Sequence, residues 1–113
     1  MVAINKLSEA PPYAVEQAIK RLGENLRLAR IRRRYTLEEV AQKIGTGVRA
    51  VMDAEKGKPS TGVAVYAALL WAYDLLQPLE DLANPATDEV GMAHESAKAK
   101  TRVRKSGALD NDF

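Results

Sequence analysis

The sequence predicts a small all-α protein, and three observations favour that fold class. Apolar residues recur every three or four positions over much of the chain, which is the period of an amphipathic helix. Glycine and proline stand between these stretches, where helices end and begin. The chain has only seven glycines, four tyrosines, one tryptophan and one phenylalanine among its 113 residues, fewer than sandwiches and barrels usually contain. This length corresponds to one small domain.

Several classes of protein are excluded by composition. The chain has no cysteine, so disulfides, thiolate metal sites and cysteine nucleophiles are excluded. Its first residues lack the basic region and apolar run of a signal peptide. The longest apolar stretch, Val63 to Tyr73, is shorter than the roughly 20 residues that cross a bilayer. We therefore expect a cytoplasmic protein with no membrane partner.

The first long helix is expected from Tyr13 to about Arg33. Residues 1–12 form an N-terminal arm, and Pro12 suits the first position of a helix. One apolar stripe is formed by Val15, Ile19, Leu22, Leu26 and Ala29. A second, partial stripe contains Leu28, Ile31 and Tyr35, and we expect the arm to cover it through Ile4, Leu7 or Tyr13.

Two short helices are predicted next, joined by a glycine turn. Thr36 and Glu39 have the spacing of a capping box, which opens a helix over 37–44. The segment Gly45-Thr46-Gly47 ends this helix, because glycine adopts the left-handed conformation that a tight turn needs. A second helix follows from Val48 to about Lys56, and Gly57 and Pro59 stop it.

Two more helices complete a predicted domain over residues 13–85. Ser60 or Thr61 caps a helix that extends to Tyr73 and is apolar nearly all round, as expected of a helix in the core or at a subunit contact. A short fifth helix over 79–83 follows Gln77-Pro78 and ends before Asn84-Pro85.

Residues 86–113 are predicted to be a flexible, disordered tail, basic and then acidic, with a helical patch near 88–98. Charge is segregated along the chain: residues 20–34 carry +6, 59–95 carry −6, 96–105 carry +5 and 106–113 carry −2. Such blocks favour a polyanionic partner, although a basic run is also found on ordinary solvated helix faces. The residues from Leu109 to Phe113 have the composition of either a short docking peptide or a frayed terminus.

The pair of short helices after a basic helix is the feature that points to function. Two helices joined by a tight glycine turn form a helix-turn-helix, whose second helix places its N-terminal side chains in the major groove of DNA. A helix fits the width of that groove, and its N-terminus also offers N–H donors to phosphates.

The residues themselves resemble the Cro/repressor-type (Xre) helix-turn-helix family over positions 20–83. The resemblance is carried by the runs Gly23–Arg30, Tyr35–Gly45 and Glu55–Ser60, together with Val51. It implies a five-helix, lambda-repressor-like domain that binds double-stranded DNA. Within the family, the arginine-rich first helix, the run Asn84–Gly91 and the tail resemble HipB-like regulators. That narrower resemblance implies an antitoxin that represses its own operon and has a HipA-like kinase toxin as a partner.

The resemblance also implies roles for individual residues. Val48, Arg49 and Met52 occupy positions that face base edges, and Arg49 is the one strong hydrogen-bonding reader among them. The positions implied at the sugar-phosphate backbone are Thr36, Lys56 and Lys58, and Lys43 and Arg34 are candidates to join them. Arg30 and Glu55 match a pair that joins the third and first helices of the domain.

Three residues depart from the family pattern. Leu37 stands where a polar residue usually touches the DNA backbone, Gly47 replaces the polar cap of the recognition helix, and Asp53 brings negative charge to the face near phosphates. Two alternatives therefore stay open. One is an interaction module that neutralises a partner toxin with weak or no specific DNA binding, and the other is a phage-type repressor without a toxin partner.

A homodimer matching a palindromic operator is the expected assembly. The candidate contact is an apolar surface formed by Trp71, Leu75, Leu76, Leu79 and Leu82. Trp71 and Tyr73 are interpreted as core or interface rather than as a ligand cage. No catalytic, cofactor or metal constellation is evident, and His94, the single histidine, lies in the predicted tail.

Overall fold

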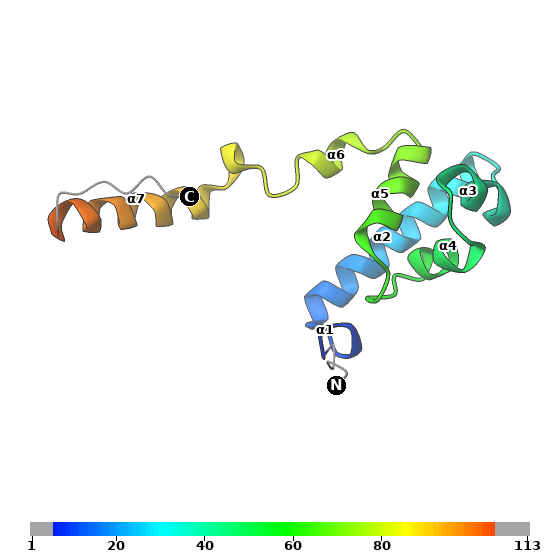
Figure 1. The fold of residues 1–113 in the computed structure, drawn as a ribbon, viewed down its shortest axis with the longest axis horizontal. Helices are drawn as coiled ribbons and strands as arrows, with labels where there is room; N and C mark the ends of the chain where they lie inside the picture. The colour runs from blue at the N-terminus through cyan, green and yellow to red at the C-terminus, as the bar shows by residue number, and fades with distance from the viewer. Residues whose placement is uncertain (1–5, 106–113) are drawn as a thin grey trace. The chain divides into compact units, whose positions relative to one another are not determined.

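A computed structural model describes residues 6–105, and the side-chain environments of residues 6–99. Its α-helices are α1 (Lys6–Glu9), α2 (Tyr13–Arg32), α3 (Leu37–Ile44), α4 (Val48–Glu55), α5 (Val63–Ala72), α6 (Gln77–Glu80) and α7 (Glu89–Lys105), with a 3-10 turn η1 at Pro85–Thr87 (Figure 1). No strand occurs within residues 6–105, so the predicted all-α class is confirmed. The chain divides into unit 1, Met1–Leu79, and unit 2, Glu80–Phe113.

The local signals that separate α3 from α4 act as predicted. The Thr36 hydroxyl accepts a hydrogen bond from the Glu39 N–H at 3.0 Å, and the Glu39 carboxylate accepts one from the Thr36 N–H at 2.8 Å. This capping box fixes the start of α3. Gly45 ends it with φ of 80° and donates its N–H to the carbonyl of Ala41 at 3.0 Å. The chain then needs only two more residues before α4 begins.

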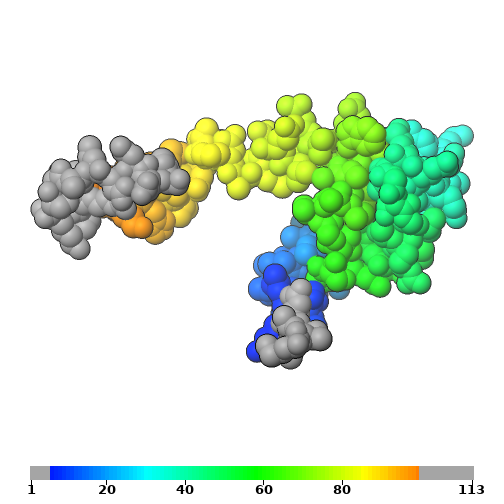
Figure 2. All heavy atoms as spheres, viewed as in Figure 1, coloured from blue at the N-terminus to red at the C-terminus, as the bar shows by residue number. Residues whose placement is uncertain are grey.

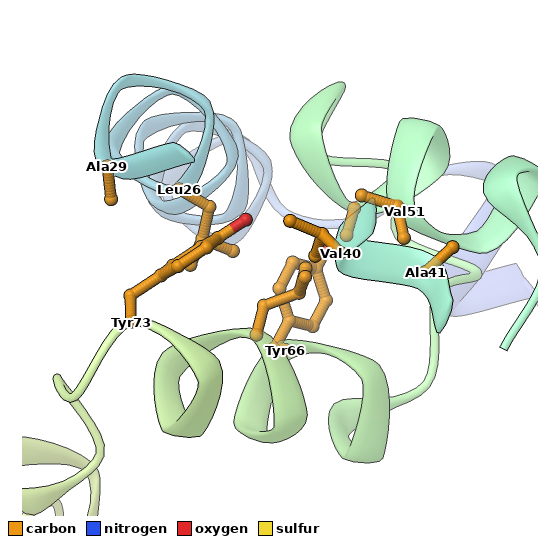
Figure 3. Packing of buried hydrophobic residues seen from close by; sticks show 9 residues of the cluster. Leu26, Ala29, Val40, Ala41, Val51, Tyr66 and Tyr73 are labelled. Atoms are coloured by element: carbon orange, nitrogen blue, oxygen red, sulfur yellow. The ribbon is translucent and has the colours of Figure 1, made fainter. Parts of the chain in front are cut away.

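The core of unit 1 lies where α4 packs against α2, α3 and α5. Side chains from these helices and from Tyr73 point toward one another in Figure 3. The buried residues are Leu26, Ala29, Val40, Ala41, Val51, Ala54, Tyr66, Leu69 and Tyr73. Val51 and Ala54 are both 0 % exposed, so α4 is held by its inner face against three other helices.

Two glycines bring α2 and the end of α4 into backbone contact. A Cβ built on Gly23 would lie 2.6 Å from the carbonyl oxygen of Ala54, which is closer than real Cβ contacts. A Cβ on Gly57 would lie 2.6 Å from the Cα of Lys20, and the φ of Gly57 is 68°. Both positions therefore require glycine for space, and Gly57 also requires it for its backbone conformation.

An ion pair fixes α4 to α2 at the same junction. The Nε of Arg30 lies 2.7 Å from Glu55 Oε2, and its Nη2 lies 3.1 Å from Oε1, so the contact is bidentate. A third guanidinium nitrogen, Nη1, donates to the carbonyl of Tyr35 at 3.0 Å. The hydrogen bond to Glu55 raises the pKa of Arg30 above its ordinary value. The predicted pairing of these two residues is thereby confirmed.

The expected cover over the second stripe of α2 is wrong for the described residues of the arm. Leu7 is 63 % exposed and Tyr13 is 76 % exposed, while Leu28 and Ile31 remain 48 % and 43 % exposed. Tyr13 is the first residue of α2 itself, and a side chain there cannot reach positions four or five turns along the same helix. Ile4 lies outside the described residues.

Unit 2 contains more helix than the tail prediction allowed. The carboxylate of Asp88 accepts a hydrogen bond from the Gly91 N–H at 2.9 Å, which caps the start of α7. From there α7 extends to Lys105, beyond the patch expected over 88–98. Its sequence contains no proline and several alanine and lysine residues, which favour helix. The residues from Leu109 to Phe113 lie outside the described part of the chain.

The short helix after α5 also differs in position from its prediction. The structure places α6 at Gln77–Glu80, two residues earlier than the expected helix over 79–83. Pro78 fits this early start because the first N–H groups of a helix have no intrahelical partner. The described residues contain seven α-helices in all, and two of them, α1 and α7, lie outside the predicted five-helix range of 13–85.

Candidate nucleic-acid interface

The α4 helix presents two different faces. Its inner face carries Val51 and Ala54, both fully buried in the core. Met52 and Asp53 each lie three or four residues from both Arg49 and Lys56, the residue that caps the end of α4, so the four lie together on the opposite face. We call these four residues the outer strip of α4. Arg49 and Lys56 are exposed, and Met52 and Asp53 are partly buried.

The three residues predicted at base edges are therefore not equivalent. Val48 packs against the core cluster and is partly buried. Arg49 is exposed and has no hydrogen bond or ion pair with any described residue. Met52 is partly buried and offers an apolar surface beside it. The outer strip thus has one free guanidinium next to one thioether, while Val48 acts mainly in the core.

The residues predicted to touch a DNA backbone lie just before α3, in the last turn of α3 and just after α4. Thr36 is exposed and uses its hydroxyl for the capping box. The ammonium of Lys43 lies 5.7 Å from the centroid of the Tyr35 ring, which holds this exposed cation close to the end of α3. Arg34 is exposed and has φ of 59°, a left-handed conformation in the turn before α3.

The ion pair between Asp53 and Lys58 was not predicted from the sequence. The Nζ of Lys58 lies 3.2 Å from Asp53 Oδ1, with the two side chains 45 % and 26 % exposed, respectively. The five-residue separation matches no helical pair, but Gly57 turns the chain back so that the two groups meet. The negative charge of Asp53 is therefore compensated within the chain, and the ammonium of Lys58 is already engaged.

The other two departures from the family pattern have structural explanations. Leu37 packs against the core cluster, so its apolar side chain contributes to packing. Gly47 precedes α4 without a side-chain cap, and a Cβ there would have no atom within 4 Å. The first N–H groups of α4 consequently receive no side-chain acceptor from the residue before the helix, and the space around Gly47 is open.

Three of the five apolar residues predicted at a subunit contact are exposed, and the other two are partly buried. Trp71 is 57 % exposed and Leu75 is 41 % exposed, whereas Leu76 and Leu79 are partly buried. Leu82, in unit 2, is 69 % exposed. In unit 1 Val63, the first residue of α5, is also exposed at 72 %, and α5 forms part of the visible face in the space-filling view (Figure 2).

Tyr73 belongs to the core and not to a site. It is 1 % exposed, stacks on Tyr35 with ring centroids 6.4 Å apart, and has the guanidinium of Arg33 5.5 Å from its centroid. Its hydroxyl has no hydrogen-bond partner among the described residues. Burial raises the pKa of Tyr73 to about 12, and the negative charge of Glu55 adds to this rise.

Potential metal ligands form no cluster among the described residues. No three histidine, aspartate or glutamate side chains among them come together as metal ligands would, and His94 is exposed on α7. No described helix combines the length and apolar character needed to cross a bilayer.

No protein-family model, curated protein or solved structure matches the chain.

Proposed function

We propose that this protein is a sequence-specific DNA-binding transcriptional repressor of the Cro/repressor-type (Xre) helix-turn-helix family. In this proposal α3 and α4 are the two helices of the motif, and α4 enters the major groove. The observation that carries it is the outer strip of α4: a free guanidinium, Arg49, on the first turn of a short helix whose opposite face is fixed in the core. An arginine at such a position can donate two hydrogen bonds to O6 and N7 of guanine.

Affinity without sequence preference would come from the cations around the strip. Lys56, Lys43 and Arg34 are exposed and suited to phosphate contacts, whereas the pairing of Lys58 with Asp53 reduces what Lys58 can add. Few phosphate contacts per domain favour a homodimer, because two domains on a palindromic operator double them. The exposed Trp71 and Leu75 are the proposed centre of the subunit contact.

The biological setting proposed is the autoregulation of a HipB-like antitoxin in the cytoplasm. This part of the proposal depends on the resemblance of the arginine-rich α2, the run Asn84–Gly91 and the tail to HipB-like regulators. A HipA-like kinase toxin would then be the second partner, besides duplex DNA.

The test is a binding titration with the DNA upstream of the protein's own gene and with a random duplex of equal length. Arg49→Ala should weaken binding to the upstream DNA by about 10- to 100-fold, because a bidentate guanine contact contributes about 1–3 kcal/mol of discrimination. Arg27→Ala, an exposed arginine on α2, is the matched control and should leave the preference intact. Equal affinity of the unmodified protein for both duplexes would exclude the proposed function.

A second candidate function is a protein-interaction module that neutralises a partner toxin. It is favoured by the exposed apolar residues Val63 and Trp71 of α5, a helix without any charged residue, and by the engagement of Lys58 with Asp53. Under this function Arg49→Ala would leave partner binding unchanged and Trp71→Ala would weaken it. A phage-type repressor would instead show the Arg49-dependent preference with no effect of its tail on any protein partner.

A further inference from the structure

The α7 helix carries a group of basic residues that has no role in the DNA contacts proposed for the outer strip of α4. Residues 96–105 contain Lys98, Lys100, Arg102, Arg104 and Lys105 and no acidic residue. All side chains of α7 up to residue 99 are exposed, including Val90 at 69 % and Met92 at 46 %. Nothing in the described part of α7 is therefore buried in a core.

The charges along α7 are arranged to stabilise a helix that has no buried core, with acidic residues at its start and basic residues in its second half. Asp88 caps its start and Glu89 stands in its first turn, where negative charge is favourable. The five cations occupy its second half, where positive charge is favourable. A helix of this length is nevertheless only marginally stable without packing, so a partner that neutralises the cations would stabilise it further.

We propose that the basic half of α7 binds the phosphate backbone of duplex DNA. Five cations within ten residues, with no carboxylate among them, give the dense positive charge that a phosphate backbone attracts. An anionic membrane is less well matched, because interfacial helices carry large apolar residues on one face. The apolar residues of this stretch are Ala97, Ala99 and Val103 only. The choice of duplex DNA as the partner rests on the proposed function, whereas the choice of a polyanion rests on the charge of residues 96–105.

The consequence is a division of the binding energy. The outer strip of α4 would carry the sequence preference, whereas α7 would add affinity that depends on salt and not on sequence. Each phosphate contact contributes about 0.9 to the slope of log K against log salt concentration.

The test uses the full chain with Lys98, Lys100, Arg102, Arg104 and Lys105 all changed to glutamine, which preserves helix propensity. Binding to a random duplex is measured over a range of salt concentrations. The slope should become shallower by about 3 to 4.5, and a control with Glu89→Gln and Glu95→Gln should not become shallower. Circular dichroism checks that both variants keep their helix content.

The outcomes separate this inference from the proposed function. An unchanged slope, with an Arg49-dependent preference still present, overturns the role of α7 and leaves the repressor proposal standing. A shallower slope in a chain that has no sequence preference supports the role of α7 and overturns the repressor proposal. Loss of binding to phosphatidylcholine–phosphatidylserine vesicles, with no change on the duplex, would assign the cations to a membrane surface and contradict the inference.

Discussion

The helices of unit 1 and the α7 helix of unit 2 have the same secondary structure for different reasons. In unit 1, α2 to α5 share a core that includes Leu26, Val51 and Leu69, all at most 1 % exposed. In α7 every side chain described is exposed, and the helix depends on its cap, its composition and the order of its charges. A packed helix fixes where each side chain points, whereas an unpacked helix mainly concentrates charge.

This difference suggests two ways of presenting cations to a polyanion. Arg49 has a defined position because Val51 and Ala54, on the other face of α4, are fixed in the core. Geometry of this kind suits the recognition of base edges. The cations of α7 have no such anchor, so their number matters more than their positions. Changes to the packing should therefore affect unit 1 strongly and α7 hardly at all.

The largest effect is expected at the backbone contact between α2 and the end of α4. Gly57→Ala would place a Cβ against Lys20 and strain a residue with φ of 68°, so it should lower the free energy of unfolding by about 3–5 kcal/mol. Gly47→Ala has open space and an ordinary φ, and it should cost no more than about 1 kcal/mol. Denaturant unfolding of both variants measures the difference, and equal losses would contradict the close packing.

Glu55→Ala should have the next largest effect. It leaves the guanidinium of Arg30, whose side chain is 13 % exposed, with the carbonyl of Tyr35 as its remaining hydrogen-bond partner among the described residues. Breaking such a pair should lower the free energy of unfolding by about 2–4 kcal/mol. The double change of Arg30→Met and Glu55→Leu removes both charges and should recover most of this loss. A double variant as unstable as Glu55→Ala would contradict this account, because the loss of stability would then not come from the unpaired charge of Arg30.

A smaller effect is expected at alkaline pH. Because the pKa of Tyr73 is raised to about 12 in the folded chain, the unfolded chain loses this proton first, near its ordinary value of about 10. Folding stability should therefore fall as the pH rises from about 10 to 12. Tyr73→Phe removes this contribution, so the fall measured by denaturant unfolding over this pH range should become shallower. At neutral pH, Tyr73→Phe should cost little because its hydroxyl has no partner among the described residues.

The smallest effect on stability is expected in α7. Ala99→Pro removes a backbone donor in the middle of the helix and should reduce helical circular dichroism. The thermal midpoint of unit 1 should stay within the error of the measurement, because the buried core of unit 1 is formed by residues of α2 to α5 and Tyr73. A lowered midpoint would contradict this expectation.

The sequence predicted those parts of the fold that depend on local signals. The capping box at Thr36, the left-handed Gly45 and the apolar period of α2 each determine a boundary or a face by themselves. The pairing of Arg30 with Glu55 came from a resemblance and agrees with the structure. For the candidate interface, the base-edge roles of Val48, Arg49 and Met52 came from the resemblance and stay predictions; the structure leaves Arg49 exposed and the other two partly buried.

Features that no apolar period or short motif describes were missed. The ion pair of Asp53 with Lys58 requires the turn at Gly57, which no residue period describes. The arm was expected to cover Leu28 and Ile31, but apolar composition alone does not say which surfaces meet. The length of α7 was underestimated because the absence of an apolar period suggested disorder, although composition and capping suffice for a helix.

The most direct test of the central claim is chemical-shift mapping of the full chain with duplex DNA from the region upstream of its gene. The account predicts that the largest changes occur at Arg49, Met52 and Lys56, with smaller ones at Thr36 and Lys43. Changes concentrated at Val63 and Trp71 on α5, with the signals of α4 unmoved, would contradict it.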